Sequence, residues 1–431
     1  MNIQSVCVPS CMHTLRVCLT IFIAAFIPAV VQAETSQQTT SLSLSQAMQQ
    51  TLEQHPALQV FPLREQKLEG QKKTANLRPA YVVGADIENL AGTGELSGVK
   101  SLETSVTLSS VLELGDKRRS RVDLVEQQTE VVRVERQIKA LDLLGEVTRR
   151  YVLTLNSQER VQLAEVGLEL AQTTLTEVKK RVNSAVAPKA DMWRAEAAVE
   201  QAKLTLSAER RQLETNKMLL VNLWGSYQPD FKSVSGSLYE LDSAVPFDTL
   251  FEQVQQNPKI EFFATETRVR DAQVRLARTE QVADLTWSVG IRRDEGLDAT
   301  AFVAGVSIPL FSRQRAEGNI EAALAARNEI TYQRQDLLLQ LHSQLYRAYL
   351  GRKQAVESIN KLQQVIIPKL MESLKQTRSG YQRGLYSYLD LLTVRENMLQ
   401  AKRDVIEAAT AAHQFQAEIE QLTAQPLADM D

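Results

Sequence analysis

Four stretches of the chain alternate between apolar and polar side chains with a period of two. They cover residues ~81–90, ~101–111, ~283–292 and ~300–309. In the third stretch the apolar series is Leu285, Trp287, Val289 and Ile291, with polar or small residues between them. Alternation over about 10 residues is what a strand of a membrane β-barrel requires, because one face meets lipid and the other meets water. A two-sided sheet in contact with water would show the same pattern, so the alternation alone leaves both open.

Two very long segments carry the period of a coiled coil. Residues 117–181 and 313–378 contain no strong helix breaker except Pro368, which is expected to kink its helix. Some 65 residues at about 1.5 Å per residue give a helix of roughly 100 Å. Heptad-spaced apolar residues cover 161–182 and 391–422, which predicts knobs-into-holes packing between antiparallel helices. The expected fold class is mainly α with a membrane β-barrel part.

The two halves of the chain follow one plan. The stretch 52–56 resembles 254–258 after a shift of 202 residues (258 − 56), and Asp191 corresponds to Asp390 after a shift of 199 (390 − 191). We therefore expect two internal repeats, each with two strands and a long helical hairpin. The first would cover residues 34–230, with strands ~81–90 and ~101–111 and a hairpin ~116–224. The second would cover residues 231–431, with strands ~283–292 and ~300–309 and a hairpin ~313–424.

The N-terminus predicts export. Residues 17–31 are almost wholly apolar, and Val31-Gln32-Ala33 suits a cleavage site, so residues 1–33 are expected to be a secretory signal peptide. An uncleaved membrane anchor is the alternative. All 3 cysteines lie in this segment, so the mature chain is expected to contain no disulfide. The net charge of −3, with no basic block, argues against nucleic acid as a partner.

The number of strands constrains the assembly. Four strands from one chain cannot close a barrel, and an open sheet edge is not tolerated in lipid. Two chains would supply about eight strands, whose interior is filled by side chains, whereas three would supply about twelve and leave a water-filled lumen. This geometry predicts a homotrimeric channel. A dimeric coiled-coil rod, acting as an exported scaffold without a channel, would explain the helices and leave the strands unexplained.

Each long helical segment must reverse direction, and the second reversal has the sequence GYQRGLYSYLDLL. Gly380 and Gly384 permit the φ angles of a tight helix–helix turn, and the tyrosines are expected to brace or present this tip. Ser387 is a suitable N-cap, which places Asp390 in the first turn of the returning helix. Asp191 has the corresponding place after the first reversal. Each aspartate is either an ordinary helix-start acid or, around a symmetry axis, part of a ring of charge that selects cations and gates.

Nothing in the sequence predicts an enzyme. The three histidines of the mature chain (His55, His342 and His413) are far apart and are expected to be surface or capping residues. No HExxH, GxSxG or P-loop motif occurs, and no cofactor or resident metal is expected. The sequence therefore favours a passive conduit that opens by small helix shifts at the tip.

Particular motifs resemble a known family. They are ENLAGTGE at 88–95, LELGDKR at 112–118, SIPLFSRQRAEG at 307–318 and the tip sequence quoted above. Over essentially the whole mature chain, the sequence resembles the TolC-type outer-membrane efflux proteins. Within that family it most resembles the outer-membrane subunit of cobalt–zinc–cadmium resistance systems. The resemblance implies a trimeric 12-stranded barrel over an α-helical periplasmic tube in the outer membrane of a Gram-negative bacterium. It also implies a periplasmic membrane-fusion adaptor and an inner-membrane RND pump as partners.

The resemblance also implies roles for residues at the two reversals. Asp390, Asp191 and Tyr381 fall where related tips carry pore-aperture residues. The adaptor would dock at Gly384, Leu385, Tyr386 and Ser387. Tyr386 stands where some relatives have an arginine that locks the closed aperture, and Ala185 replaces the glycine expected in the first tip, which puts adaptor docking there in doubt. The expected cargo is divalent metal cations; drugs or other small organic solutes are the alternative.

Overall fold

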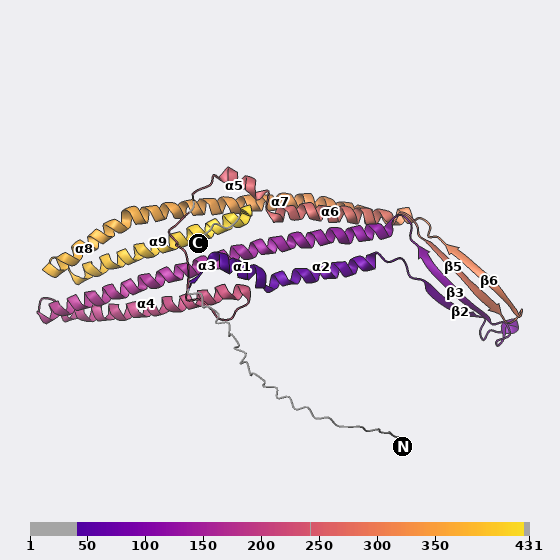
Figure 1. The fold of residues 1–431 in the computed structure, drawn as a ribbon, viewed down its shortest axis with the longest axis horizontal. Coiled ribbons are helices and arrows are strands. Elements are labelled where there is room, and N and C mark those ends of the chain that lie inside the picture. The colour runs from indigo at the N-terminus through magenta and orange to yellow at the C-terminus, as the bar shows by residue number, and fades with distance from the viewer. Residues whose placement is uncertain (1–40, 242, 426–431) are drawn as a thin grey trace, which may run out of the picture. The chain divides into compact units, whose positions relative to one another are not determined.

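The computed structural model describes residues 41–241 and 243–425 (Figure 1). The expected signal peptide and all three cysteines lie outside these ranges. In the first half of the chain, helices α1 (Leu44–Gln54) and α2 (Pro56–Ala75) lead into strands β2 (Val82–Glu88) and β3 (Glu103–Leu112). Helices α3 (Lys117–Asn183) and α4 (Lys189–Val221) follow. None of the described helices is both long enough and apolar enough to cross a membrane.

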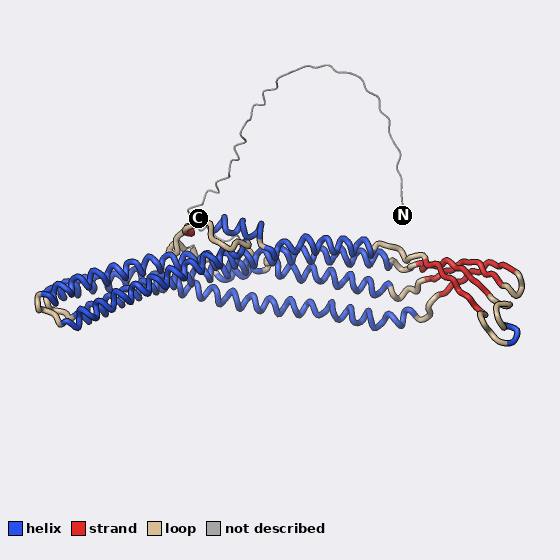
Figure 2. The backbone as a smooth tube through the Cα atoms, turned by 90° about the horizontal axis from the view of Figure 1, so that it is seen from below, coloured by secondary structure: helices blue, strands red, loops and turns tan. Residues whose placement is uncertain are grey.

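The second half runs through the same order of elements. Helices α5 (Phe247–Val254) and α6 (Pro258–Thr279) precede strands β5 (Leu285–Asp294) and β6 (Ala299–Ser307). Helices α7 (Ser312–Lys361), α8 (Ile367–Arg383) and α9 (Tyr388–Thr423) follow. A short parallel pair joins β1 (Ser41–Leu42) to β4 (Ser233–Val234). The helices run side by side, with the strands at one end and the α3/α4 and α8/α9 turns at the other (Figures 1 and 2).

The four long strands form one antiparallel sheet in the order β2-β3-β5-β6. In its register Val289 lies between Leu108 and Ala304, and Leu108 in turn pairs with Val83. The apolar series of all four strands therefore falls on one face of the sheet, as the alternation predicts. Within the described residues β2 and β6 each pair on one side only, so the sheet has two free edges.

The opposite face carries small and polar side chains, and one glycine there is required by a close approach. A Cβ atom on Gly290 would lie 2.3 Å from the carbonyl oxygen of Val106 and 2.9 Å from the Cα of Thr107. No real Cβ contact is that short, so a larger residue would force β5 away from β3. One face of the sheet is thus mainly apolar and the other mainly small or polar, with Val82, Val111 and Val303 as apolar residues on the second face.

The expected kink at Pro368 takes another form. The helical path is distorted by a π-helical turn at Leu362–Ile366, and Pro368 lies at the start of α8 just beyond it. A proline has no N–H and its ring clashes with the carbonyl four residues earlier, here that of Gln364. That carbonyl lies inside the π turn, so widening the helix one turn before the proline relieves the clash.

The main core lies where both halves of the chain meet, around Tyr151 of α3. This side chain is fully buried, and its hydroxyl oxygen lies 2.9 Å from the carbonyl oxygen of Leu42 and 2.7 Å from that of Ser235. The hydroxyl therefore connects α3 to β1 and to the residue that follows β4. The heptad positions of α9 are buried or half-buried along its length, which confirms the predicted coiled-coil stripe.

Candidate functional site: the acidic helix turns

The two reversals have the same backbone design. At the end of α3 the Val186 N–H donates to the Arg181 carbonyl (2.9 Å), and the Ala185 N–H donates to the Val182 carbonyl (3.0 Å). At the end of α8 the Leu385 N–H donates to the Gly380 carbonyl (2.8 Å), and the Gly384 N–H to the Tyr381 carbonyl (3.1 Å). This pair of bonds is the Schellman motif, which needs one residue in the left-handed region. That residue is Gly384 (φ 84°) in one turn and Ala185 (φ 57°) in the other.

Replacing Ala185 with glycine is expected to stabilise the protein. An L-residue in the left-handed region destabilises the folded state by about 1–2 kcal/mol, which glycine avoids. Glycine also makes the unfolded chain more flexible, and this lowers the gain in stability by about 0.4–1 kcal/mol. The A185G variant should therefore have a higher thermal unfolding temperature. G384A is the matched control at the corresponding position and should lower it. An A185G protein that melts at or below the wild-type temperature would mean that the left-handed backbone of Ala185 is not strained.

Gly380 serves a different purpose from the one expected. It lies inside α8 and is not among the residues with positive φ. A Cβ atom there would lie 2.3 Å from Cδ2 of the Tyr386 ring and 2.7 Å from its Cε2. The ring of Tyr386 thus folds back over the missing side chain, which sets the position of a residue predicted to contact the adaptor.

Substituting Gly380 by alanine should therefore displace the Tyr386 ring. Overpacking of this kind costs about 1–3 kcal/mol, which should appear as a lower unfolding temperature. In the background Y386A the same glycine substitution should cost much less, and a double-mutant cycle measures that difference. Equal costs in both backgrounds would mean that the ring does not constrain position 380.

Asp390 closes a capping box at the start of α9. Its Oδ2 accepts from the Ser387 backbone N–H (2.9 Å) and from the Ser387 hydroxyl (2.7 Å), while the Asp390 N–H donates to Ser387 Oγ (3.2 Å). Ser387 is the N-cap, as predicted. The hydroxyl and backbone bonds from Ser387 hold the pKa of the exposed Asp390 carboxyl below its ordinary value.

The lowered pKa of Asp390 gives its stabilising effect a definite pH range. Because the folded-state pKa lies below the unfolded one, the contribution is fully present above the unfolded pKa and disappears as pH falls through the folded pKa. We expect wild type to melt above D390N at neutral pH and the two melting temperatures to converge in acid. If the difference in melting temperature between wild type and D390N stays constant as pH falls, protonation of Asp390 is not linked to stability.

Asp191 sits in the corresponding place with different partners. The residue before α4 is Pro188, which has no N–H and provides no side-chain cap. The Asp191 carboxylate instead pairs with Arg194 (Oδ1 to Nη1, 3.5 Å), and its side chain is only 18% exposed. The two acids are therefore not equivalent: Asp390 is open to solvent, whereas Asp191 is mostly covered.

Two of the three tip tyrosines brace the structure. Tyr381 and Tyr388 are each 2% exposed, whereas Tyr386 is about half exposed. The guanidinium of Arg181 lies 4.5 Å from the Tyr381 ring centre, so this ring joins α8 to the end of α3. Burial is the main reason that the pKa of both buried phenols is raised. Tyr381 was predicted at the pore aperture; within this chain its ring faces neighbouring helices.

Sequence reasoning missed Tyr388 and Arg181 as parts of this site. Tyr388 packs with Leu391 and Val178 in one buried cluster that also includes Tyr381. A usable signal existed, because Tyr388 lies three residues before Leu391, which extends the heptad stripe of α9 to its first residue. Arg181 carried no such signal, since its contact depends on a residue 200 positions later.

The predicted adaptor-docking residues form the exposed end of the α8/α9 turn. Gly384 and Ser387 are exposed, and the Leu385 side chain is 69% exposed. Val186, at the corresponding position of the other turn, is also an exposed aliphatic side chain. An exposed leucine and valine at two adjacent turns offer apolar contacts to a partner.

The histidines have structural roles. His55 caps α2 by accepting from the Ala57 N–H (3.0 Å), a ring nitrogen of His413 lies 3.1 Å from the Leu238 carbonyl oxygen, and His342 packs on Phe247 and Phe251. Among the described residues no group of three or more His, Cys, Asp or Glu side chains is placed to hold a metal ion.

The fold is that of outer-membrane channels. It superimposes on CusC, a protein described as forming a transmembrane channel, with a TM-score of 0.72 over 88% of this chain and 91% of CusC at 16% identity. It also superimposes on the outer membrane protein VceC of Vibrio cholerae, with a TM-score of 0.71 over 89% of this chain and 97% of VceC at 18% identity.

The sequence places the chain in a family. The profile of outer membrane efflux proteins matches residues 47–226 and 251–425, and the protein belongs to that family. It is an efflux protein of the outer membrane and not an enzyme. It is 26% identical to the cobalt-zinc-cadmium resistance protein CzcC of Cupriavidus metallidurans over 304 residues, 70% of this chain and 73% of CzcC. It is 21% identical to the pyoverdine export outer membrane protein OpmQ of Pseudomonas putida over 331 residues, 74% of this chain and 69% of OpmQ.

Proposed function

We propose that the protein is the outer-membrane duct of a tripartite efflux system and conducts divalent metal cations passively to the exterior. The four-stranded sheet is the observation that supports a channel. Its apolar series lies on one face, and its two outer strands each have an unpaired edge within the described residues. Lipid does not tolerate such edges, so sheets from several copies must join.

Three copies satisfy this requirement with a lumen. Sheets of four strands joined in a ring of three give a barrel of about twelve strands, wide enough for water, whereas two give a barrel that side chains fill. The small and polar face would then line the lumen, and the apolar face would meet outer-membrane lipid. The helices would continue below the barrel as the periplasmic tube, with the α3/α4 and α8/α9 turns at its far end.

The turns would form the aperture and the docking surface. In a homotrimer the exposed Asp390 carboxylates would form a ring of three charges, and Asp191 would stand behind them, partly covered. Such rings favour cations. Leu385, Tyr386 and their neighbours would meet the membrane-fusion adaptor, which joins the duct to an inner-membrane RND pump.

The likeness to CzcC supports metal cations as the cargo. A second candidate is an organic solute, which the likeness to the pyoverdine export protein OpmQ favours. Deleting the gene and measuring growth in zinc, cobalt or cadmium separates the two. Metal sensitivity that the restored gene reverses supports the first; unchanged metal tolerance with sensitivity to organic toxicants supports the second. A scaffold without a channel is disfavoured by membership of the efflux family.

Conductance in planar bilayers tests the channel itself. The purified mature protein should produce discrete, cation-selective current steps, and cross-linking should give a trimer. Correctly folded trimers that conduct no ions, alone or with their adaptor, would overturn the proposal.

A further inference from the structure

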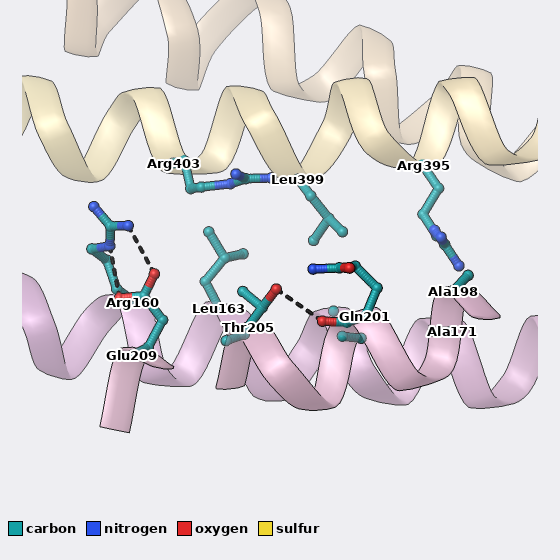
Figure 3. A pocket seen from close by; sticks show the side chains of 13 residues that line it. Arg160, Leu163, Ala171, Ala198, Gln201, Thr205, Glu209, Arg395, Leu399 and Arg403 are labelled. Atoms are coloured by element: carbon teal, nitrogen blue, oxygen red, sulfur yellow. Dashed lines mark hydrogen bonds and ion pairs between the residues drawn. The ribbon is translucent and has the colours of Figure 1, made fainter. Parts of the chain in front are cut away.

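A pocket of about 160 Å³ lies between the α3/α4 hairpin and α9 (Figure 3). Its walls are built largely from small residues, which lets the helices come close while leaving space between their side chains. These are Ala164, Gly167, Ala171, Ala198 and Ala202. Leu399 lies over Gly167 in the middle of the pocket. A Cβ atom added to Gly167 would lie 3.6 Å from Cδ1 of Leu399, which is an ordinary van der Waals distance. The space is large enough for several water molecules or for one small anion.

The charges that line the pocket do not balance. Arg160 is neutralised by Glu209 through two hydrogen bonds of 3.0 and 2.8 Å, and its Nη1 also lies 3.8 Å from Oε1 of Glu407, which is not on the lining. Glu209 is the only acid on the lining, and Arg395 and Arg403 remain. Among the described residues neither of these two arginines forms an ion pair. Two arginines without an ion-pair partner in the described residues therefore line the pocket, Arg395 buried and Arg403 exposed to solvent.

Arg395 is the most buried of the charged residues on the lining. It is only 7% exposed, and its Nε is buried without a hydrogen-bond partner in the described part of the chain. A buried N–H without a hydrogen bond is costly, so packing alone is a poor explanation for the place of Arg395. In Figure 3 its side chain descends from α9 into the pocket toward Ala198.

Two further donors share the space. Figure 3 shows Arg403 extending from α9 along the upper wall and the Gln201 amide rising from α4 below it. A guanidinium presents up to five N–H donors and an amide two. The lining thus offers donors from two helices and few free acceptors, which is the chemistry that receives an oxyanion.

We propose that this pocket binds a small tetrahedral oxyanion, of the size and charge of inorganic phosphate, through Arg395 with help from Arg403 and Gln201. The bound anion connects α9 to the α3/α4 hairpin. It therefore stabilises the contact between the α8/α9 and α3/α4 hairpins. The inference concerns binding and does not depend on the cargo or on the channel proposed above.

Isothermal titration calorimetry of the full mature protein in detergent, with inorganic phosphate as the ligand at constant ionic strength, tests the proposal. Wild type should bind saturably and should melt at a higher temperature with phosphate than with chloride. R395Q should lose at least tenfold in affinity, R395K should retain part of it, and R403Q should lose a smaller factor. R334Q is the control, since Arg334 is an exposed arginine of α7 away from the pocket.

Three outcomes would overturn the inference. One is the absence of saturable binding to wild type. The second is an R395Q protein that binds phosphate like wild type. The third is an equal loss in R334Q, which would mean non-specific attraction. Circular dichroism reports whether R395Q is folded; if it is not, R403Q and Q201L decide the question alone, and normal binding by both overturns the proposal.

Discussion

Replacing Val289 with arginine is expected to abolish insertion of the protein into the outer membrane. Val289 is near the middle of β5 on the apolar face, flanked by Leu108 and Ala304 on the neighbouring strands. Its side chain is 47% exposed in the single chain, so lipid would be its natural contact. An arginine at the middle of the lipid-facing side of a barrel costs about 2–4 kcal/mol, and a trimer would pay it three times.

The neighbouring residue provides the control. Ser288 precedes Val289 in β5 and points to the opposite face, where it pairs with Ser109 and Gly305. The S288R side chain would enter the aqueous lumen, so this variant should reach the outer membrane as a trimer. Membrane fractionation with a urea wash, followed by native electrophoresis, measures both. Normal insertion of V289R would mean that this face does not meet lipid.

Removing both turn acids is expected to have the largest effect on ion selectivity. In the proposed trimer the D191N/D390N variant loses six carboxylates near the narrow end, two per chain. Its cation-over-anion permeability ratio should fall several-fold. Because Asp390 is exposed and Asp191 is 18% exposed, D390N alone should account for most of the change. Reversal potentials in asymmetric salt measure the ratio.

The capping role of Asp390 must be separated from its charge. S387A removes the hydroxyl that donates to the Asp390 carboxylate but keeps the charge. It should lower the unfolding temperature and leave selectivity near that of wild type. An unchanged permeability ratio in D191N/D390N would mean that the acids serve only to start their helices. A ratio altered as strongly by S387A would assign the effect to helix geometry.

Local features of this protein could be predicted from short stretches of its sequence. The alternation around Val289 predicted both the strand and the face on which each side chain lies, because a strand repeats every two residues. The heptads predicted the long helices and the buried stripe of α9. Ser387 and Asp390 formed the expected capping box, since this motif depends on residues three positions apart.

Contacts between distant segments could not be predicted in this way. Gly380 was assigned to a positive φ, whereas the structure shows a glycine kept free for the Tyr386 ring. Tyr381 faces Arg181 from 200 positions away. Arg395 had no feature in the sequence that distinguished it from the many solvent-exposed arginines of long helices.

The sequence by itself thus determined the elements, their faces and the capping of the second turn. All of these arise from interactions within a few residues along the chain. The tertiary structure alone decided which tyrosines are buried, that the two turn acids differ in exposure, and that two arginines without an ion-pair partner in the described residues line one pocket. Those properties depend on how the α3/α4 and α8/α9 hairpins pack, and burial changes the energy of a charge or a hydroxyl far more than its position in the sequence does.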